Sequence, residues 1–411
     1  MHIYIAGIGG AGLGPLAQLS LDCGYTVSGS DLSESLLTAV LAKKGIGYSL
    51  DQSGKYLEEV NQANPIDLYV FSSAVRADNP EYQTALKLGI KTTKRSGLLN
   101  TILQDKKLKL LAVAGTHGKT TTTAMCVWLF KQLSIPVSYS IGTTLSWAPA
   151  AQYQEGSEWF VYEADEFDRN FLDFKPEIGL VTSFDYDHPD TYPTQQEYLE
   201  AFQQFCKQSQ LVVTWSDLAQ LFEVRGAVHA LREVESHTHL SGEHNRKNAT
   251  LALRAVQSTL SEKIDPHAIS NFPGTDRRFE KIANNLYSDY AHHPTEIAAT
   301  LQLAREVNPK VVVVYQPHQN LRQYEVKGEY KNCFAGAERV YWLPTYLSRE
   351  KEGLAVLTPE ELTGEIVNTE VVISQLDDAL LGDLKAELAN GALVVAMGAG
   401  SIDAWVRKFF R

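Results

Sequence analysis

The sequence has few cysteines, no long apolar run and no excess of positive charge. Only four of its 411 residues are cysteines, and no two of them form a CxxC pair. Widely spaced cysteines are typical of free thiols in a reducing compartment. We therefore expect no structural disulfides and a cytoplasmic location.

No stretch of 18 or more apolar residues is present, so the sequence predicts no transmembrane helix and no membrane partner. The first residues run straight into a glycine cluster, without a basic region and a long apolar core, so we expect no signal peptide. The formal net charge of −12 argues against nucleic acid as the main partner. An anionic small molecule is not excluded, because it needs only a few cations placed locally.

The composition is that of an ordinary globular protein, with 44% hydrophobic and 21% charged residues. A chain of this length typically forms two to four domains. Strand-like runs alternate with segments of helical period, which is typical of α/β sheets with parallel strands. Three openings, each a strand followed by a loop, predict three such units, with boundaries near residues 105 and 274. The predicted units are 1–104, 105–274 and 275–411.

The hydrophobic pattern also predicts individual elements, and the segment Asn271–Thr275 is typical of a linker or turn. The predicted strands include His2–Ala6, Leu68–Ser72, Leu108–Ala114, Phe160–Tyr162, Ile178–Thr182, Val311–Tyr315 and Leu393–Met397. The predicted helices include Thr120–Gln132, Tyr198–Cys206 and a segment from Thr295 to about Glu306.

A first glycine loop follows the first strand and satisfies the pattern G-x-G-x-x-G at Gly7, Gly9 and Gly12. An acidic residue, Asp31, follows after roughly 20 residues, at the end of a second strand. Glycines at these positions let the backbone approach a diphosphate at a helix N-terminus. A tight turn without a ligand, a nicotinamide dinucleotide site and a site for another diphosphate such as a UDP-sugar all fit this pattern.

A second loop carries the chemistry of a nucleotide phosphate loop. Gly118, Lys119 and Thr120 stand between a predicted strand and a predicted helix, where backbone amides surround phosphates and the lysine reaches the terminal ones. The threonine hydroxyl suits Mg²⁺. The strict Walker pattern requires a glycine where this sequence has Val113, so a pattern search alone would miss the loop.

Two further loops follow strands of the same central unit. One begins at Glu163 and is rich in carboxylates, and the other ends at His188. Because ligands of parallel α/β sheets bind beyond the carboxyl ends of the strands, Lys119, Glu163 and His188 should meet at one edge. A carboxylate and an imidazole near a triphosphate indicate a Mg²⁺ site, although an acidic cluster or a lone histidine is more often structural.

The remaining polar candidates lie further along the chain. Asn245 and Asn248 are close on one predicted helix and could read a purine edge, or simply cap the helix. Arg278, His293 and Arg322 supply cations, and arginine suits phosphate and carboxylate groups because its fork is bidentate. Each of these cations could equally be an ordinary surface residue.

Taken in order, the motifs resemble those of the Mur ligases over essentially the whole chain. They read G-I-G-G-A-G, A-G-T-H-G-K-T-T-T-T, E-A-D-E-x-D, D-H-P-D-T-Y, H-N-x-x-N-A, G-T-x-R-R-F, D-Y-A-H-H-P-T-E and Q-P-H. The resemblance implies Rossmann-like N- and C-terminal domains around a central P-loop ATPase domain, with ATP and Mg²⁺ as cofactors. It is greatest to the branch that adds L-alanine to UDP-N-acetylmuramate through an acyl phosphate, in peptidoglycan precursor synthesis.

The resemblance also implies roles for individual residues. Implied for the UDP substrate are Gly7, Gly9, Gly10, Gly12, Asp31, Ser72 and Ser73. Implied for ATP are Gly115, Thr116, His117, Gly118, Lys119, Thr120, Thr121, Asn245 and Asn248. Implied as metal ligands are Thr120, Glu163 and His188, and the implied catalytic set is Lys119, Glu163, His188, Arg278, Asp289 and His293. His293 and Arg322 are implied to handle the incoming amino acid.

Two features depart from the family pattern. Gln319 follows the Q-P-H motif where an arginine is common, and the connection from Asp217 to Gly242 is short. The alternatives are the branch that recycles a whole tripeptide and a non-catalytic nucleotide-binding homologue. A nicotinamide-dependent dehydrogenase would leave Lys119 and its loop without a purpose. The oligomeric state, the base for the amine, and the choice among alanine, serine and glycine are not indicated.

Overall fold

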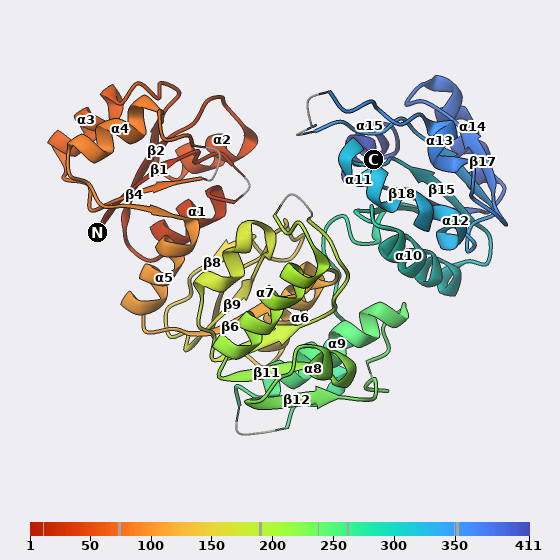
Figure 1. The fold of residues 1–411 in the computed structure, drawn as a ribbon, viewed down its shortest axis with the longest axis horizontal. Helices are drawn as coiled ribbons and strands as arrows, with labels where there is room; N and C mark the ends of the chain where they lie inside the picture. The colour runs from red at the N-terminus through yellow and green to blue at the C-terminus, as the bar shows by residue number, and fades with distance from the viewer. Residues whose placement is uncertain are drawn as a thin grey trace. The chain divides into compact units, whose positions relative to one another are not determined.

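The computed structural model describes residues 1–10, 12–72, 75–188, 191–236, 238–260, 263–348, 350 and 353–411. Within these residues the strands form three sheets with helices packed on them (Figure 1). Contacts divide the chain into two compact units, one of Met1–Glu233 with Leu251–Ile269 and one of Val234–Thr250 with Ser270–Arg411. The predicted α/β class, with Rossmann-like N- and C-terminal sheets and a central nucleotide-loop sheet, is confirmed.

The N-terminal sheet is entirely parallel and has the strand order β3-β2-β1-β4-β5. Its strands are β1 (His2–Ala6), β2 (Thr26–Ser30), β3 (Gly47–Ser49), β4 (Leu68–Phe71) and β5 (Thr92–Lys94). Its helices are α1 (Gly14–Asp22), α2 (Leu36–Lys43), α3 (Lys55–Ala63), α4 (Pro80–Lys87) and α5 (Arg95–Asp105). The strand order changes direction at β1, and the first glycine loop follows this strand.

The central sheet has the order β12-β11-β10-β6-β9-β7-β8, and only β8 is antiparallel to its neighbour among the described strands. Its strands are β6 (Lys109–Ala114), β7 (Val137–Ser140), β8 (Ala151–Gln152), β9 (Trp159–Glu163), β10 (Ile178–Val181), β11 (Leu211–Trp215) and β12 (Ala227–Leu231). The helices are α6 (Lys119–Gln132), η1 (Phe167–Asp173), α7 (Gln195–Gln208), α8 (Ser216–Leu221) and η2 (Pro266–Ile269). Helix α9 (Glu243–Gln257) is divided between the two units after Thr250.

The third sheet lies in the second unit and has the order β13-β14-β18-β15-β16-β17, with β13 antiparallel to β14. Its strands are β13 (Glu280–Ala283), β14 (Leu286–Asp289), β15 (Val311–Tyr315), β16 (Arg339–Trp342), β17 (Glu370–Ile373) and β18 (Leu393–Met397). The helices are α10 (Pro294–Val307), α11 (Asn320–Val326), η3 (Lys327–Glu329), α12 (Tyr330–Cys333), α13 (Pro359–Thr363), α14 (Asp378–Ala389) and α15 (Ile402–Phe410).

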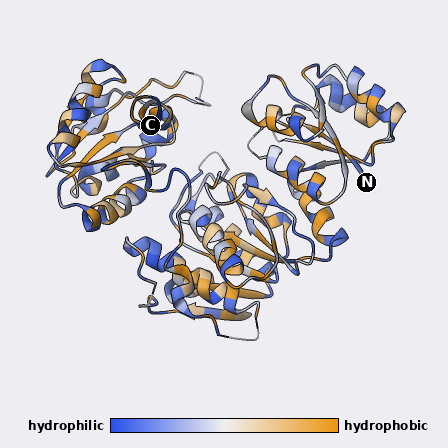
Figure 2. Cartoon of the chain, turned by 180° about the vertical axis from the view of Figure 1, so that it is seen from behind, coloured by the Kyte–Doolittle hydropathy of each residue, from blue (hydrophilic) through white to orange (hydrophobic). Residues whose placement is uncertain are grey.

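Central strands are buried on both faces, which explains why their sequences are continuous runs of apolar residues. Every residue of β15 and β18 is buried, as is β6 after its first residue. Many strands of the sheets are coloured hydrophobic, while many helices carry hydrophilic residues (Figure 2). Such sheets leave polar side chains at strand ends, where the candidate site lies. Among the described residues no helix is both long and apolar enough to cross a membrane.

Candidate active site

The second glycine loop connects β6 to α6 and has a conformation that requires glycine. Gly115 has a φ of +132° and Gly118 a φ of +82°, in the region that L side chains rarely adopt. A Cβ on Gly115 would also lie 2.1 Å from Thr182 Oγ1. The loop therefore packs directly on the segment after β10, without room for a side chain.

Side-chain hydrogen bonds fix this loop to the segment after β10. Thr116 Oγ1 donates to the Asp185 carbonyl at 2.8 Å and accepts from the Asp185 amide at 2.9 Å. The amide of His117 donates to Ser183 Oγ at 2.8 Å, and its carbonyl accepts from Thr182 Oγ1 at 2.6 Å. The phosphate loop is thus held in place by its own unit.

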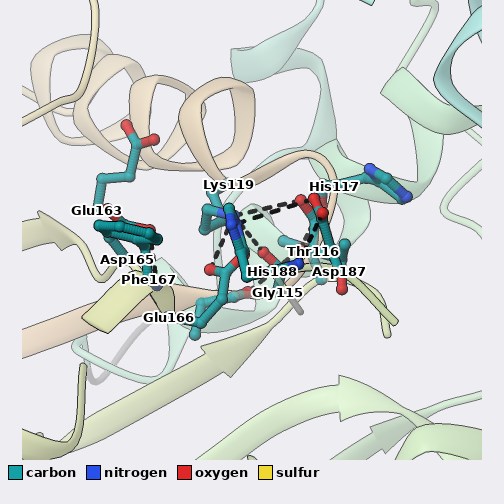
Figure 3. A network of polar contacts seen from close by, with 12 residues as sticks. Gly115, Thr116, His117, Lys119, Glu163, Asp165, Glu166, Phe167, Asp187 and His188 are labelled. Carbon is teal, nitrogen blue, oxygen red and sulfur yellow. Dashed lines mark hydrogen bonds and ion pairs between the residues drawn. The ribbon is translucent and has the colours of Figure 1, made fainter. Parts of the chain in front are cut away.

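Lys119 opens α6 and lies at the centre of a polar network (Figure 3). Its ammonium donates to the carbonyls of Gly115 at 2.6 Å and Thr116 at 3.2 Å. It also lies 2.9 Å from both carboxylate oxygens of Glu166, whose side chain is 1% exposed. His188 approaches the same carboxylate, with Nε2 3.6 Å from Oε1.

This buried pair is charged, as the pKa shifts indicate. Burial alone would raise the pKa of Glu166, but the charges of Lys119 and His188 more than offset it, so this pKa lies below its ordinary value. Burial alone would likewise lower the pKa of Lys119, yet Glu166 and Asp165 hold it above its ordinary value. The Lys119 ammonium is therefore a positive charge that the phosphate loop keeps at neutral pH.

Thr120 and Glu163, two of the predicted metal ligands, lie together. Thr120 Oγ1 donates to Glu163 Oε1 at 2.7 Å, and the amide of Gly142 donates to Glu163 Oε2 at 2.6 Å. Thr121 is buried next to Thr120 in the first turn of α6. In the described part of the chain, no three His, Cys, Asp or Glu side chains are placed to hold a metal ion.

The third predicted ligand, His188, has a left-handed backbone with a φ of +59°. Its ring also lies edge-on to Phe167, with ring centroids 5.5 Å apart. A second histidine of the site, His117, lies with Nε2 2.9 Å from Asp185 Oδ2. Lys119, Glu163 and His188 therefore lie at or beyond the carboxyl ends of three neighbouring parallel strands, at one sheet edge as predicted. Glu166 lies between the lysine and the histidine.

Asp31, which follows β2, accepts a hydrogen bond from the first glycine loop. Its Oδ2 accepts from the Gly9 amide at 2.7 Å, and its Oδ1 accepts from the Leu32 amide at 2.7 Å. A Cβ on Gly7 would lie 3.7 Å from Ser72 Oγ, so the loop after β4 adjoins the first turn of the glycine loop. Gly10 also lies in this turn, with its amide donating to the Gly7 carbonyl at 3.0 Å.

Two further residues were predicted for the UDP substrate, Gly12 in this loop and Ser73 in the loop after β4. Gly12 is exposed, whereas Ser73 lies outside the described residues.

The predicted residues of the second unit also cluster. Arg278 Nη1 lies 3.7 Å from Glu296 Oε1, and His293 caps α10, the helix that carries Glu296. Asp289 ends β14, where its carboxylate accepts from the amides of Phe279 and Ala291, both at 2.7 Å. Burial raises the pKa of Asp289 to about 6, although Arg278 opposes this shift.

Asn245 and Asn248 lie on α9 as predicted, but they differ in exposure. The amide of Asn245 donates to the Ser241 carbonyl at 3.0 Å, and Asn248 is buried. Arg322 lies in the first turn of α11, and Gln319 precedes this helix with a φ of +61°.

The raised pKa of Asp289 predicts a pH-dependent contribution to stability. Because the folded carboxyl holds its proton to about pH 6 and the unfolded one releases it near pH 4, its contribution should fall as pH rises from 4 to 7. We expect the melting temperature of the wild type, relative to Asp289→Asn, to decrease over this range. Thermal denaturation of both proteins at each pH measures it, and a constant difference would contradict the prediction.

Sequence reasoning missed two residues of this site. Glu166 was only one of four carboxylates within six residues, and nothing in that cluster indicates which one turns inward. Gly142 could not be found because its contribution is a backbone amide.

Comparison with known proteins gives the class of protein. Residues 2–107 match the "Mur ligase family, catalytic domain", residues 113–229 the "Mur ligase middle domain" and residues 277–400 the "Mur ligase, glutamate ligase domain". These matches cover most of the sequence, and the chain belongs to the Mur ligase family.

Within the family, this chain is similar to UDP-N-acetylmuramate–L-alanine ligases. It is 31% identical to that of Chlorobium phaeovibrioides over 466 aligned positions, covering 100% of this chain and 97% of the relative. It is 33% identical to that of Renibacterium salmoninarum, covering 98% and 93% of the two chains. The alignment with the Chlorobium protein is longer than this chain, so that relative contains segments absent here.

Solved structures agree with this similarity. UDP-N-acetylmuramate-alanine ligase from Thermotoga maritima has a TM-score of 0.76 and 25% identity, covering 100% of this chain and 98% of that one. A murein peptide ligase from Psychrobacter arcticus has a TM-score of 0.64 and 22% identity, covering 99% and 98%, and shares the fold. The predicted resemblance to the alanine-adding branch is confirmed.

Proposed function

We propose that this chain is an ATP-dependent ligase that joins L-alanine to UDP-N-acetylmuramate in peptidoglycan precursor synthesis. The observation that carries the proposal is the Lys119 network, in which a buried, charged lysine closes a glycine loop beside Thr120 and Glu163. Full-length similarity to alanine-adding ligases supports the choice of substrate. We propose the cytoplasm as its place of action, because the reaction consumes ATP.

In the proposed reaction, the muramyl carboxylate attacks the γ-phosphate of ATP, and ADP leaves. Lys119 exchanges its loop carbonyl contacts for phosphate oxygens and offsets the charge that develops during transfer. The amine of alanine then attacks the acyl phosphate carbon, and the tetrahedral intermediate releases phosphate and leaves an amide. Arg278 and His293 act in this second step. Asn245 and Asn248 bind the ATP nucleotide.

Mg²⁺ fits the donor set at the phosphate loop. Thr120 and Glu163 offer a hydroxyl and a carboxylate 2.7 Å apart, and hard oxygen donors of this kind suit Mg²⁺ bound together with ATP phosphates. These two residues would hold the ion, which would supply charge neutralisation at the phosphates, and His188 would act from its contact with Glu166.

The first glycine loop is proposed to hold the UDP diphosphate through Gly7, Gly9, Gly10 and Gly12. Asp31 contributes by fixing the Gly9 amide, so its role is to shape the loop. We also propose domain boundaries near residues 104 and 274. The first domain would bind the nucleotide sugar, the second would bind ATP, and the third would handle the amino acid.

The choice between free alanine and a tripeptide is testable by competition. With UDP-N-acetylmuramate, ATP and Mg²⁺ present, we expect L-alanine to be the dominant acceptor when it competes with an equimolar free tripeptide. The reason is that the sequence is similar to UDP-N-acetylmuramate–L-alanine ligases along nearly its whole length. Mass spectrometry of the products decides the matter, and a dominant tripeptide adduct would assign the chain to the recycling branch instead.

A parallel assay tests the reaction itself. Phosphate release from ATP should require both UDP-N-acetylmuramate and L-alanine for multiple turnovers. Release that is independent of both substrates, or no release under any condition, would favour a nucleotide-binding protein without ligase activity.

A further inference from the structure

We propose that Arg95 is a binding residue for the diphosphate of the nucleotide-sugar substrate and that it connects the first glycine loop to the phosphate site. This inference rests on the proposed function and adds a residue to it. Arg95 is the first residue of α5, and it belongs to none of the motifs discussed above.

The position of the guanidinium is the first observation. Its Nη1 lies 3.4 Å from the point that a Cβ on Gly12 would occupy. Gly12 is the last glycine of the loop and stands two residues before α1, whose N-terminus has no side-chain cap and no acidic residue in its first turn. A diphosphate bound along this loop would therefore find an arginine beside the amides of the helix start.

The other end of the guanidinium is the second observation. Arg95 Nη2 lies 3.3 Å from Asp165 Oδ2, and the two side chains are 28% and 37% exposed. The fork thus directs one nitrogen to a carboxylate while the other faces the glycine loop. Asp165 fixes the orientation of Arg95 without consuming the nitrogen that faces Gly12.

The same helix end is anchored at several points to the segment that follows β9. Ser96 Oγ donates to Asp173 Oδ2 at 2.5 Å, and Asn100 donates to the Asp173 carbonyl at 3.0 Å. Asp165 in turn acts on the ammonium of Lys119, whose pKa it helps to raise. Arg95 is therefore one step removed from the lysine of the phosphate loop, while it borders the loop proposed for the sugar nucleotide.

Three variants separate ligand binding from a structural role. Arg95→Gln removes the guanidinium, Asp165→Asn breaks the same ion pair but keeps the guanidinium, and Lys94→Gln removes the neighbouring ion pair to Asp168, at 3.4 Å. Calorimetric titration with UDP-N-acetylmuramate, without ATP, measures binding. We expect Arg95→Gln to weaken it about tenfold or more, Asp165→Asn to weaken it clearly less, and Lys94→Gln to match the wild type.

The ligand series identifies the contacted group. We expect the defect of Arg95→Gln to appear equally with UDP and to vanish with uridine, since uridine has no phosphate. Equal losses in Arg95→Gln and Asp165→Asn, or a loss with uridine, would mean a structural bridge and overturn the inference. A defect seen with UDP-N-acetylmuramate but absent with UDP would also overturn it, by placing the contact on the sugar or its carboxylate.

Binding of UDP-N-acetylmuramate by the wild type distinguishes a failure of the proposed function from a failure of the role proposed for Arg95. If the wild type binds no UDP-N-acetylmuramate, the proposed function fails at its substrate. If it binds and Arg95→Gln binds equally well, only the role of Arg95 fails.

Discussion

Replacement of Lys119 by alanine is expected to reduce ligation by about a thousandfold and to leave UDP-N-acetylmuramate binding unchanged. The lysine places a permanent cation at the phosphate loop, and a preorganised charge of this kind acts chiefly on the transition state. Its hydrogen bonds go to residues in loops that follow strands of the central sheet, whereas the first glycine loop follows a strand of the N-terminal sheet. Phosphate release measures the first effect and calorimetry the second.

The matched control is Lys131→Ala. Lys131 lies in the last turn of the same helix, with its ammonium 5.2 Å from the centre of the Trp147 ring. We expect this variant to ligate at the wild-type rate. Retained substrate binding in Lys119→Ala certifies that it is folded. Lost binding in a variant that still unfolds cooperatively on heating would mean that the two nucleotide sites are not separate.

Replacement of Glu166 by glutamine is expected to lower both stability and activity strongly. The substitution keeps the shape of the side chain but leaves the Lys119 ammonium, only 15% exposed, without its nearest counter-charge. Breaking one partner of a buried pair typically costs about 3–5 kcal/mol. ATP should restore part of the loss because its phosphates provide the missing negative charge.

Thermal denaturation with and without ATP measures both parts of this prediction. We expect ATP to raise the melting temperature of Glu166→Gln by more than that of the wild type. The control is Glu197→Gln, which removes a solvent-exposed pair with Arg169 at 3.5 Å and should cost no more than about 1 kcal/mol. Equal melting of Glu166→Gln and the wild type would show that the buried pair contributes little.

Much of the fold could be predicted because buried parallel strands are continuous apolar runs. The bounds of His2–Ala6, Val311–Tyr315 and Leu393–Met397 are those of β1, β15 and β18. Helix α7 extends beyond the predicted Tyr198–Cys206, since Thr194 caps it by accepting from the Glu197 amide at 3.2 Å.

Elements at or next to the edges of the central sheet were not predicted. Strand β12 was missed because three of its five residues are exposed and the strand lies at the sheet edge. The β7–β8 pair was missed because β8 has only two residues. Edge elements of this kind depend on neighbours that are distant in sequence, so local pattern carries little information about them.

The candidate site could be predicted as a location but not as a set of contacts. The rule for strand ends correctly brought Lys119, Glu163 and His188 to one edge. It could not place Glu166, because the chain turns through two left-handed residues, Asp168 and Arg169, just after it. Such turns depend on local packing and are not visible in residue spacing.

The hydrogen bonds that fix Thr116 and His117 to the segment after β10 bear on the thermodynamics of nucleotide binding. A flexible glycine loop would lose conformational entropy when it closes around phosphates, at a cost of about 1–2 kcal/mol for each residue ordered. Here that entropy is lost when the protein folds, because Asp185, Ser183 and Thr182 already hold the loop. The affinity for ATP is therefore set by what the phosphates gain from the amides and Lys119, with little deducted for shaping the loop.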